Sequence, residues 1–148
     1  MTFHVLISDN VDQKAVDLLE KAYGFTVTAP GKMSREQVLA AIPGADALII
    51  RSGTTADAEL LEKATSLKAI ARAGVGVDNV DLDVATQHNI VVMNTPDGNT
   101  ISTAEHTFGL MLALARFIPI SHQGMNEGRW DRKTFMGTEL RGKTLGIL

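Results

Sequence analysis

Residues 47–71 read ALIIRSGTTADAELLEKATSLKAIA and contain one complete strand–helix–strand unit. The stretches 47–50 and 67–71 are short apolar runs, and residues 58–64 between them are predicted to form a helix. Both runs are nearly continuous instead of alternating with polar residues, as is typical of strands in a parallel sheet that helices cover on both faces. This unit therefore indicates an α/β fold.

The same order of elements recurs on both sides of this unit. Further strands are predicted over residues 5–7, 25–28 and 90–93. Further helices are predicted over residues 11–22, from the capping box at Ser34 to Pro43-Gly44, and from Asp81 through Gln87. Five strands separated by helices predict a doubly wound parallel sheet over about residues 1–95.

The composition excludes several classes of protein and site. The 148 residues include no cysteine, which excludes a disulfide scaffold, a thiolate metal site and a cysteine nucleophile. Lys plus Arg is 14 and Asp plus Glu is 17, so the formal charge is −3 and a nucleic acid partner is not expected. The N-terminus has no export signal, and the apolar run near residues 108–118 is broken by Arg116. We therefore expect a cytoplasmic protein with no membrane partner.

A turn-rich segment, NTPDGN at residues 94–99, is the best candidate for a domain boundary. It divides the chain into an expected first domain over residues 1–97 and a second part over residues 98–148. In the second part, Ser102 to Glu105 has the pattern of a capping box. The helix predicted after it, over residues 103–118, is apolar on almost all sides, so we expect it to be buried or packed on a partner.

The last 24 residues are less regular. Residues 125–141 are polar, contain two glycines and are expected to be irregular. Residues 143–148 read KTLGIL and are predicted to form the first strand of another unit.

A parallel sheet binds ligands at the carboxyl ends of its strands. Charged residues and glycines follow the predicted strands at these ends. Arg51 and Arg72 end neighbouring strands, and guanidinium groups suit carboxylate and phosphate. Gly74 and Gly76 allow backbone N–H groups to approach an anion. These residues predict a small anionic ligand, with two acidic groups. The alternative is that the two arginines form ion pairs with Asp9, Asp46 or Asp78.

The other motifs do not indicate a functional site. Gly74-Val75-Gly76 follows a predicted strand, but Asn79 stands where a dinucleotide fingerprint has its third glycine. No histidine has metal-ligand spacing, so no metal is expected, and Glu105 and His106 are adjacent on a helix and cannot act as one dyad. A phosphoacceptor signalling domain of similar fold would need an aspartate at the end of the third strand, where Arg51 stands.

Several segments occur together in an order and at distances that match one known family. They are Ile50-Arg51-Ser52, RAGVGVDNVD at residues 72–81, VMNTP at 92–96, NTISTAEH at 99–106, Trp130, FMGTEL at 135–140 and GKTLGIL at 142–148. Over the whole chain they resemble the N-terminal part of the D-isomer-specific 2-hydroxyacid dehydrogenases, in particular the members that oxidise 3-phosphoglycerate. The 72–81 and 135–140 segments make this resemblance highly specific.

The resemblance implies a flavodoxin-like substrate domain followed by the start of a Rossmann NAD-binding domain. It also implies NAD-linked oxidation of 3-phosphoglycerate to 3-phosphohydroxypyruvate in serine synthesis, by a homodimer that packs through the 103–118 helix.

The resemblance assigns roles to individual residues. It places Arg51, Ser52 and Asn99 on the substrate phosphate. It places Arg72, Ala73 and the backbone of Gly74 to Gly76 at the carboxylate end, and Val75 and Thr103 on the nicotinamide side of NAD. Some relatives have a threonine hydroxyl at position 75, which Val75 lacks.

The chain lacks parts that this family uses for catalysis. The G-x-G-x-x-G loop of the family, which follows the strand at 145–148, is not present in the 148 residues. The family's catalytic Arg, Glu and His also lie further downstream, so no catalytic residue is expected in this chain and no turnover by it alone. The alternative is a non-catalytic anion-binding and dimerisation module of flavodoxin-like fold.

Overall fold

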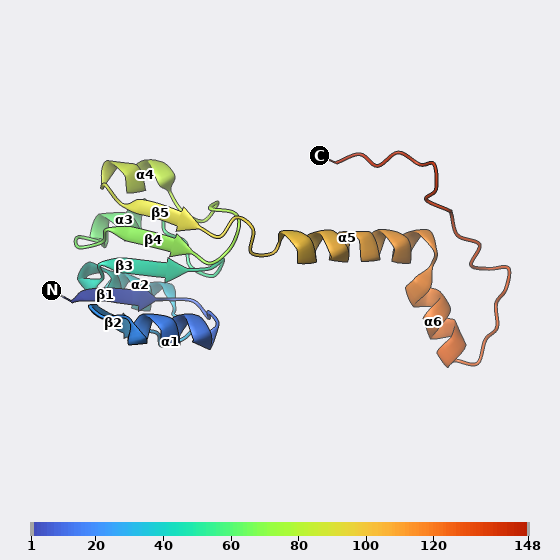
Figure 1. The fold of residues 1–148 in the computed structure, drawn as a ribbon, viewed down its shortest axis with the longest axis horizontal. Helices are drawn as coiled ribbons and strands as arrows, with labels where there is room; N and C mark the ends of the chain where they lie inside the picture. Colours follow the sequence, from blue (N-terminus) through green and yellow to red (C-terminus); the bar gives the residue numbers. More distant parts are fainter. Residues whose placement is uncertain (1, 148) are drawn as a thin grey trace. The chain divides into compact units, whose positions relative to one another are not determined.

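A five-stranded sheet forms the centre of the first of two structural units, which ends at Asn99 (Figure 1). The computed structural model describes residues 2–147. The strands are β1 (Phe3–Ile7), β2 (Phe25–Thr28), β3 (Ala47–Ile50), β4 (Ala69–Arg72) and β5 (Val91–Asn94). All pairs are parallel, and the order is β2-β1-β3-β4-β5. This is the flavodoxin-like order, so the prediction of a doubly wound sheet is confirmed.

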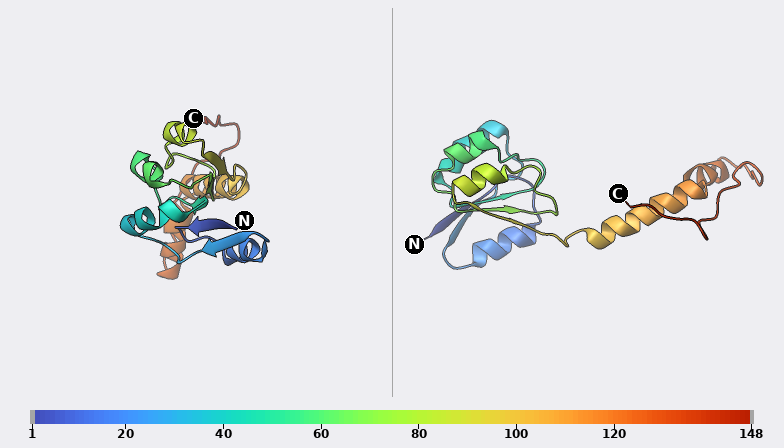
Figure 2. Two further views of the ribbon diagram at one scale, coloured as in Figure 1. Left: turned by 90° about the vertical axis from the view of Figure 1, so that its left-hand side faces the viewer. Right: turned by 90° about the horizontal axis from the view of Figure 1, so that it is seen from above.

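Helices cover both faces of this sheet. Figure 2 shows α1 (Gln13–Lys21) on one face and α2 (Arg35–Ala41), α3 (Ala58–Lys63) and α4 (Leu82–Gln87) on the other. The predicted capping box at Ser34 is confirmed, because its side chain accepts from the N–H of Gln37 and the Gln37 side chain accepts from the N–H of Ser34. The chain after α2 tightens into a 3₁₀ turn, η1 (Ile42–Gly44).

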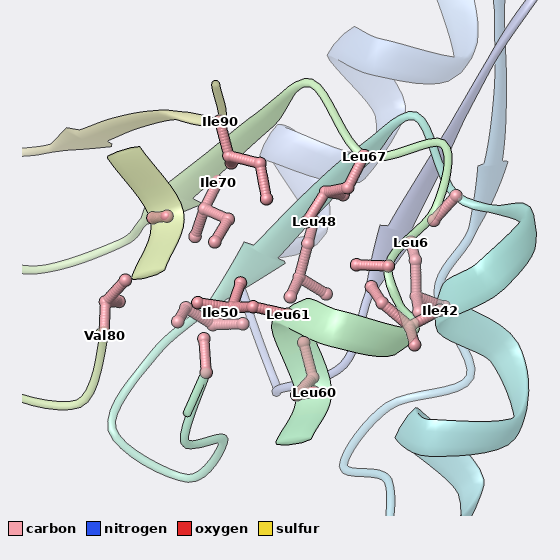
Figure 3. Packing of buried hydrophobic residues seen from close by; sticks show 14 of the residues in the cluster. Leu6, Ile42, Leu48, Ile50, Leu60, Leu61, Leu67, Ile70, Val80 and Ile90 are labelled. Carbon is pink, nitrogen blue, oxygen red and sulfur yellow. The ribbon is translucent and has the colours of Figure 1, made fainter. Parts of the chain in front are cut away.

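Alternation along the strands divides the core between the two faces. Leu6, Leu48 and Ile70 are side by side in the strand register and point to the α2–α3 face, where they join the larger apolar cluster (Figure 3). Val5 and Ile7 point to the other face and pack with Val16 of α1. Successive side chains of a strand point to opposite faces, so strands buried on both sides read as continuous apolar runs.

The second unit, from Thr100, contains two helices, α5 (Thr100–Ala115) and α6 (Ile118–Asn126). The prediction of one helix over residues 103–118 is therefore wrong at both ends. Phe117 has a left-handed backbone (φ 55°), and Pro119 lies in the first turn of α6. Proline has no N–H to donate to the carbonyl four residues earlier, and that residue is Ala115, where α5 stops.

Two smaller predictions in the second unit also need correction. Ser102 lies inside α5 and is not its N-cap, because the helix begins two residues earlier. Residues 143–147 do not form the predicted strand, and Leu148 lies outside the described residues. A strand forms only through hydrogen bonds to a neighbouring strand, and within residues 2–147 no strand lies beside this segment. None of the helices described over residues 2–147 has the length and apolar character needed to cross a membrane.

Candidate functional site

Two arginines leave the sheet side by side at its carboxyl edge. Arg51 directly follows β3, and Arg72 is the last residue of β4. The register pairs Ile50 with Arg72 and Arg72 with Asn94, so the ends of β3, β4 and β5 are level. The expected convergence of Arg51 and Arg72 at one edge is therefore present in the fold.

The loop after β3 is built on a buried carboxylate. Asp9, directly after Ser8 at the end of β1, is only 5% exposed. Its Oδ2 accepts hydrogen bonds from the backbone N–H groups of Arg51 (2.7 Å) and Thr54 (3.0 Å). Thr54 also shares a hydroxyl–hydroxyl bond of 2.9 Å with Ser8. A buried carboxylate is stable only with such donors, so Asp9 is satisfied by the loop backbone.

Neither arginine forms an ion pair among residues 2–147. The Arg51 guanidinium instead donates from Nη1 to the carbonyl oxygen of Asn10 (3.1 Å). Asp46 pairs with Lys68, whose hydrogen bond lowers the pKa of that carboxyl. The alternative that Arg51 and Arg72 serve as surface ion pairs is therefore wrong, and both positive charges remain for a ligand.

Arg72 folds back over the glycine two residues ahead of it. A Cβ atom built on Gly74 would overlap Nη1 of Arg72, so the guanidinium lies against the bare Cα. The N–H of Gly74 donates to the Arg72 carbonyl at 2.8 Å, which makes a tight turn. The Nε of Arg72 is buried without a hydrogen-bond partner in the described chain. Glycine at position 74 thus sets where this guanidinium can lie.

The loop that follows β4 is fastened to β5. The Asn94 side chain donates to the Val75 carbonyl (2.6 Å), and the N–H of Thr95 donates to the Gly74 carbonyl (2.9 Å). The N–H of Ala73 is also occupied, by the Ile50 carbonyl. Within residues 2–147 the N–H groups of Val75 and Gly76 have no such acceptor. They can still bind an anion, as can the N–H groups of Val77 and Asp78, which also have no such acceptor among residues 2–147.

The remaining predicted site residues are spread over both units. Ser52 is exposed in the loop after β3, and Asn99 is the last residue of the first unit. Thr103 lies on α5 in the second unit. Their assignments to phosphate and nicotinamide stay predictions, as does that of Ala73.

A second group of charges lies on the α2–α3 side and is neutralised internally. Nη2 of Arg35 contacts Oδ1 of Asp57 (2.6 Å) and Oε2 of Glu59 (2.9 Å). These hydrogen bonds raise the pKa of Arg35 and lower the pKa of both carboxyls. Asp57 also caps α3 by accepting from the N–H of Leu60. Arg35 therefore does not add a third free cation. Among residues 2–147, no three acidic or histidine side chains gather as metal ligands do.

The model of the D-isomer specific 2-hydroxyacid dehydrogenase catalytic domain matches residues 5–143. The chain belongs to this family. It is 50% identical to the D-3-phosphoglycerate dehydrogenase of Archaeoglobus fulgidus over 144 aligned residues. The aligned residues are 97% of this chain and 27% of that protein. The chain thus spans about a quarter of the length of the curated relatives it matches.

Two solved structures have a fold similar to that of this chain. The TT0316 protein from Thermus thermophilus is 33% identical with a TM-score of 0.83, over 94% of this chain and 46% of that one. The NAD⁺-bound 3-phosphoglycerate dehydrogenase of Entamoeba histolytica is 34% identical with a TM-score of 0.69, over 78% and 40% of the two chains. The resemblance of the sequence to the dehydrogenase family is confirmed.

Proposed function

We propose that this dehydrogenase-family chain supplies the substrate-binding part of an NAD-dependent enzyme that oxidises 3-phosphoglycerate to 3-phosphohydroxypyruvate. The observation that carries the proposal is the pair of arginines without ion-pair partners at one sheet edge, beside free backbone donors. A ligand with two acidic groups matches two such cations. The 50% identity to a D-3-phosphoglycerate dehydrogenase favours this ligand over other 2-hydroxyacids.

The two ends of the substrate are assigned to the two loops. Arg51, with Ser52 and Asn99, binds the phosphate. Arg72 binds the carboxylate together with the N–H groups of Val75 and Gly76. The Gly74 backbone contributes its tight turn, and its bare Cα leaves room for the Arg72 guanidinium.

The residues present fit one end of NAD. Val75 is 40% exposed and offers an apolar side chain without a hydrogen-bonding group, which suits contact with a ring and not with a phosphate. We assign Val75 and Thr103 to the nicotinamide side. NAD, when bound, accepts the hydride from the hydroxyl-bearing carbon of the substrate. Because these 148 residues contain no G-x-G-x-x-G loop, we propose that they bind substrate and do not turn it over alone.

A calorimetric titration tests the substrate assignment. The chain is expected to bind 3-phosphoglycerate more tightly than D-glycerate, which has the carboxylate and no phosphate. Arg51→Ala should remove this preference, because it deletes the proposed phosphate contact. Arg132→Ala, in the second unit, is the matched control and should keep it. Equal affinity of the unsubstituted chain for both acids would refute the phosphate assignment, and NADH formation by the chain would refute the proposed lack of turnover.

We also propose that two copies associate through α5. No residue of this helix is buried, and Leu114 is 79% exposed although the helix is strongly apolar. An apolar depression of about 270 Å³ continues this surface where α5 meets α6. It is lined by Leu110, Ala113, Leu114, Phe117, Pro119 and Ile120. Apolar surface of this kind marks an interface, and a symmetric dimer is the commonest way to cover it.

Sedimentation of the chain tests this association. The unsubstituted chain should sediment as a dimer, and Leu114→Glu should convert it to a monomer because each interface would gain two buried charges. Leu18→Glu, on the exposed side of α1, should leave the dimer intact. A monomeric unsubstituted chain, or a Leu114→Glu dimer of unchanged stability, would rule out the α5 interface.

A further inference from the structure

Both ends of the loop that carries Arg51 and Ser52 are held by two side chains from neighbouring segments. The carboxylate of Asp9 accepts the N–H groups of Arg51 and Thr54. The side-chain amide of Asn79 donates from Nδ2 to the carbonyl oxygens of the same two residues, at 2.6 Å each. The N–H and the C=O of both loop ends are therefore occupied, by one acceptor group and one donor group.

The two side chains come from opposite sides of β3. Asp9 follows β1 and Asn79 lies in the loop after β4, and β3 lies between these strands in the sheet. Asn79 is itself fixed, because its carbonyl accepts the N–H of Ala56 at 2.8 Å beside the short parallel bridge between Ala56 and Val80. The loop is thus held between two segments that the sheet already places.

The chemistry of each position matters as well as its shape. Asn79 uses both hydrogens of its amide on the loop, so a carboxylate there would face two carbonyl oxygens and repel them. Asp9 needs room beside it, and a Cβ atom on Gly53 would overlap its Oδ1. Glycine at position 53 therefore allows the carboxylate to approach the loop backbone.

We propose that Asp9 and Asn79 are positioning residues that clamp residues 51–54 and thereby hold Arg51 and Ser52 for the substrate phosphate. This inference rests on the proposed function for its ligand, but the clamp itself does not. Holding a loop before binding reduces the entropy lost when the ligand orders it. All four hydrogen bonds of the clamp end on the backbone of Arg51 and Thr54, so we expect its effect at the phosphate end.

Amide hydrogen exchange followed by NMR tests the clamp without any ligand. Asn79→Ala should speed exchange at the N–H groups of Arg51 and Thr54 about tenfold relative to the β3 amides, and Asn79→Asp should speed it more. Asp9→Asn, which keeps an acceptor oxygen, should preserve more protection than Asp9→Ala. Thr65→Ala is the control, because it removes one side-chain bond to the carbonyl of Pro43 and should not affect the loop.

The proposal is overturned if exchange at Arg51 and Thr54 rises only in step with the β3 amides, since that would report general loss of stability. It is also overturned if Asn79→Asp is milder than Asn79→Ala.

Calorimetry with the same variants tests the functional half of the inference. Asn79→Ala should weaken 3-phosphoglycerate binding about tenfold and leave D-glycerate binding unchanged, a split that simple destabilisation would not produce. Equal weakening for both acids, or none, would overturn the positioning role. If the unsubstituted chain binds neither acid, the proposed function fails and the role in holding a phosphate fails with it. The clamp itself is then decided by the exchange measurement alone.

Discussion

Replacement of Leu48 by alanine is expected to lower the free energy of unfolding of the chain by about 3 kcal/mol. Leu48 is fully buried in β3, beside Leu6 of β1 and Ile70 of β4 (Figure 3). Alanine would remove three buried carbon atoms and leave a cavity that the surrounding sheet and helices cannot close fully. Urea denaturation followed by circular dichroism measures the loss. Since single domains are stable by only about 5–15 kcal/mol, the effect is a large part of the total.

The matched control for this substitution is Leu18→Ala. It deletes the same atoms from the solvent-facing side of α1, where Leu18 is 70% exposed. Its effect should stay within about 0.5 kcal/mol. Equal losses for the two variants would contradict the position of β3 at the centre of the core.

The fold of the first unit was predictable because its signals are local. Every strand except β2, which reads FTVT, contains an apolar run, and Asp81 and Ser34 mark helix starts that the structure confirms. The break between α5 and α6 was missed although Pro119 marks it, because apolar periodicity continues through Phe117 and Ile118. Residues 143–147 show the opposite limit. An apolar segment becomes a strand only beside a partner strand, which its own sequence does not specify.

The candidate site was also predictable only in part. Arg51 and Arg72 were identified because parallel topology brings strand ends together. The parts played by Asp9 and Asn79 depend on hydrogen bonds to residues 42 and 28 positions away, respectively. From the sequence, Asp9 was considered only as an ion-pair partner, and Asn79 was noted as the residue that breaks a glycine motif and as part of the 72–81 segment. Which backbone groups these side chains bind follows from the register of β1, β3 and β4, which no local pattern shows.

Arg72→Ala is expected to weaken binding of both 3-phosphoglycerate and D-glycerate about a hundredfold. Loss of one partner from a charge-assisted contact costs about 2–5 kcal/mol, and 1.4 kcal/mol corresponds to a factor of ten. The affinity for both acids should fall, because Arg72 is assigned to the carboxylate they share. Arg72→Lys should restore only part of the affinity, since an ammonium group lacks the planar fork of a guanidinium. Calorimetry measures all of these affinities on the 148-residue chain.

Gly74→Ala provides the sharper test of how Arg72 is placed. The new Cβ would overlap Nη1 of Arg72, which is the end of a flexible side chain, so the guanidinium should move while the fold stays stable. Affinity should then fall about tenfold although the arginine is still present. In an Arg72→Ala background the same substitution should cost nothing further, because the group it displaces is gone. If Gly74→Ala weakens binding equally in both backgrounds, glycine at this position serves the loop backbone and not the guanidinium.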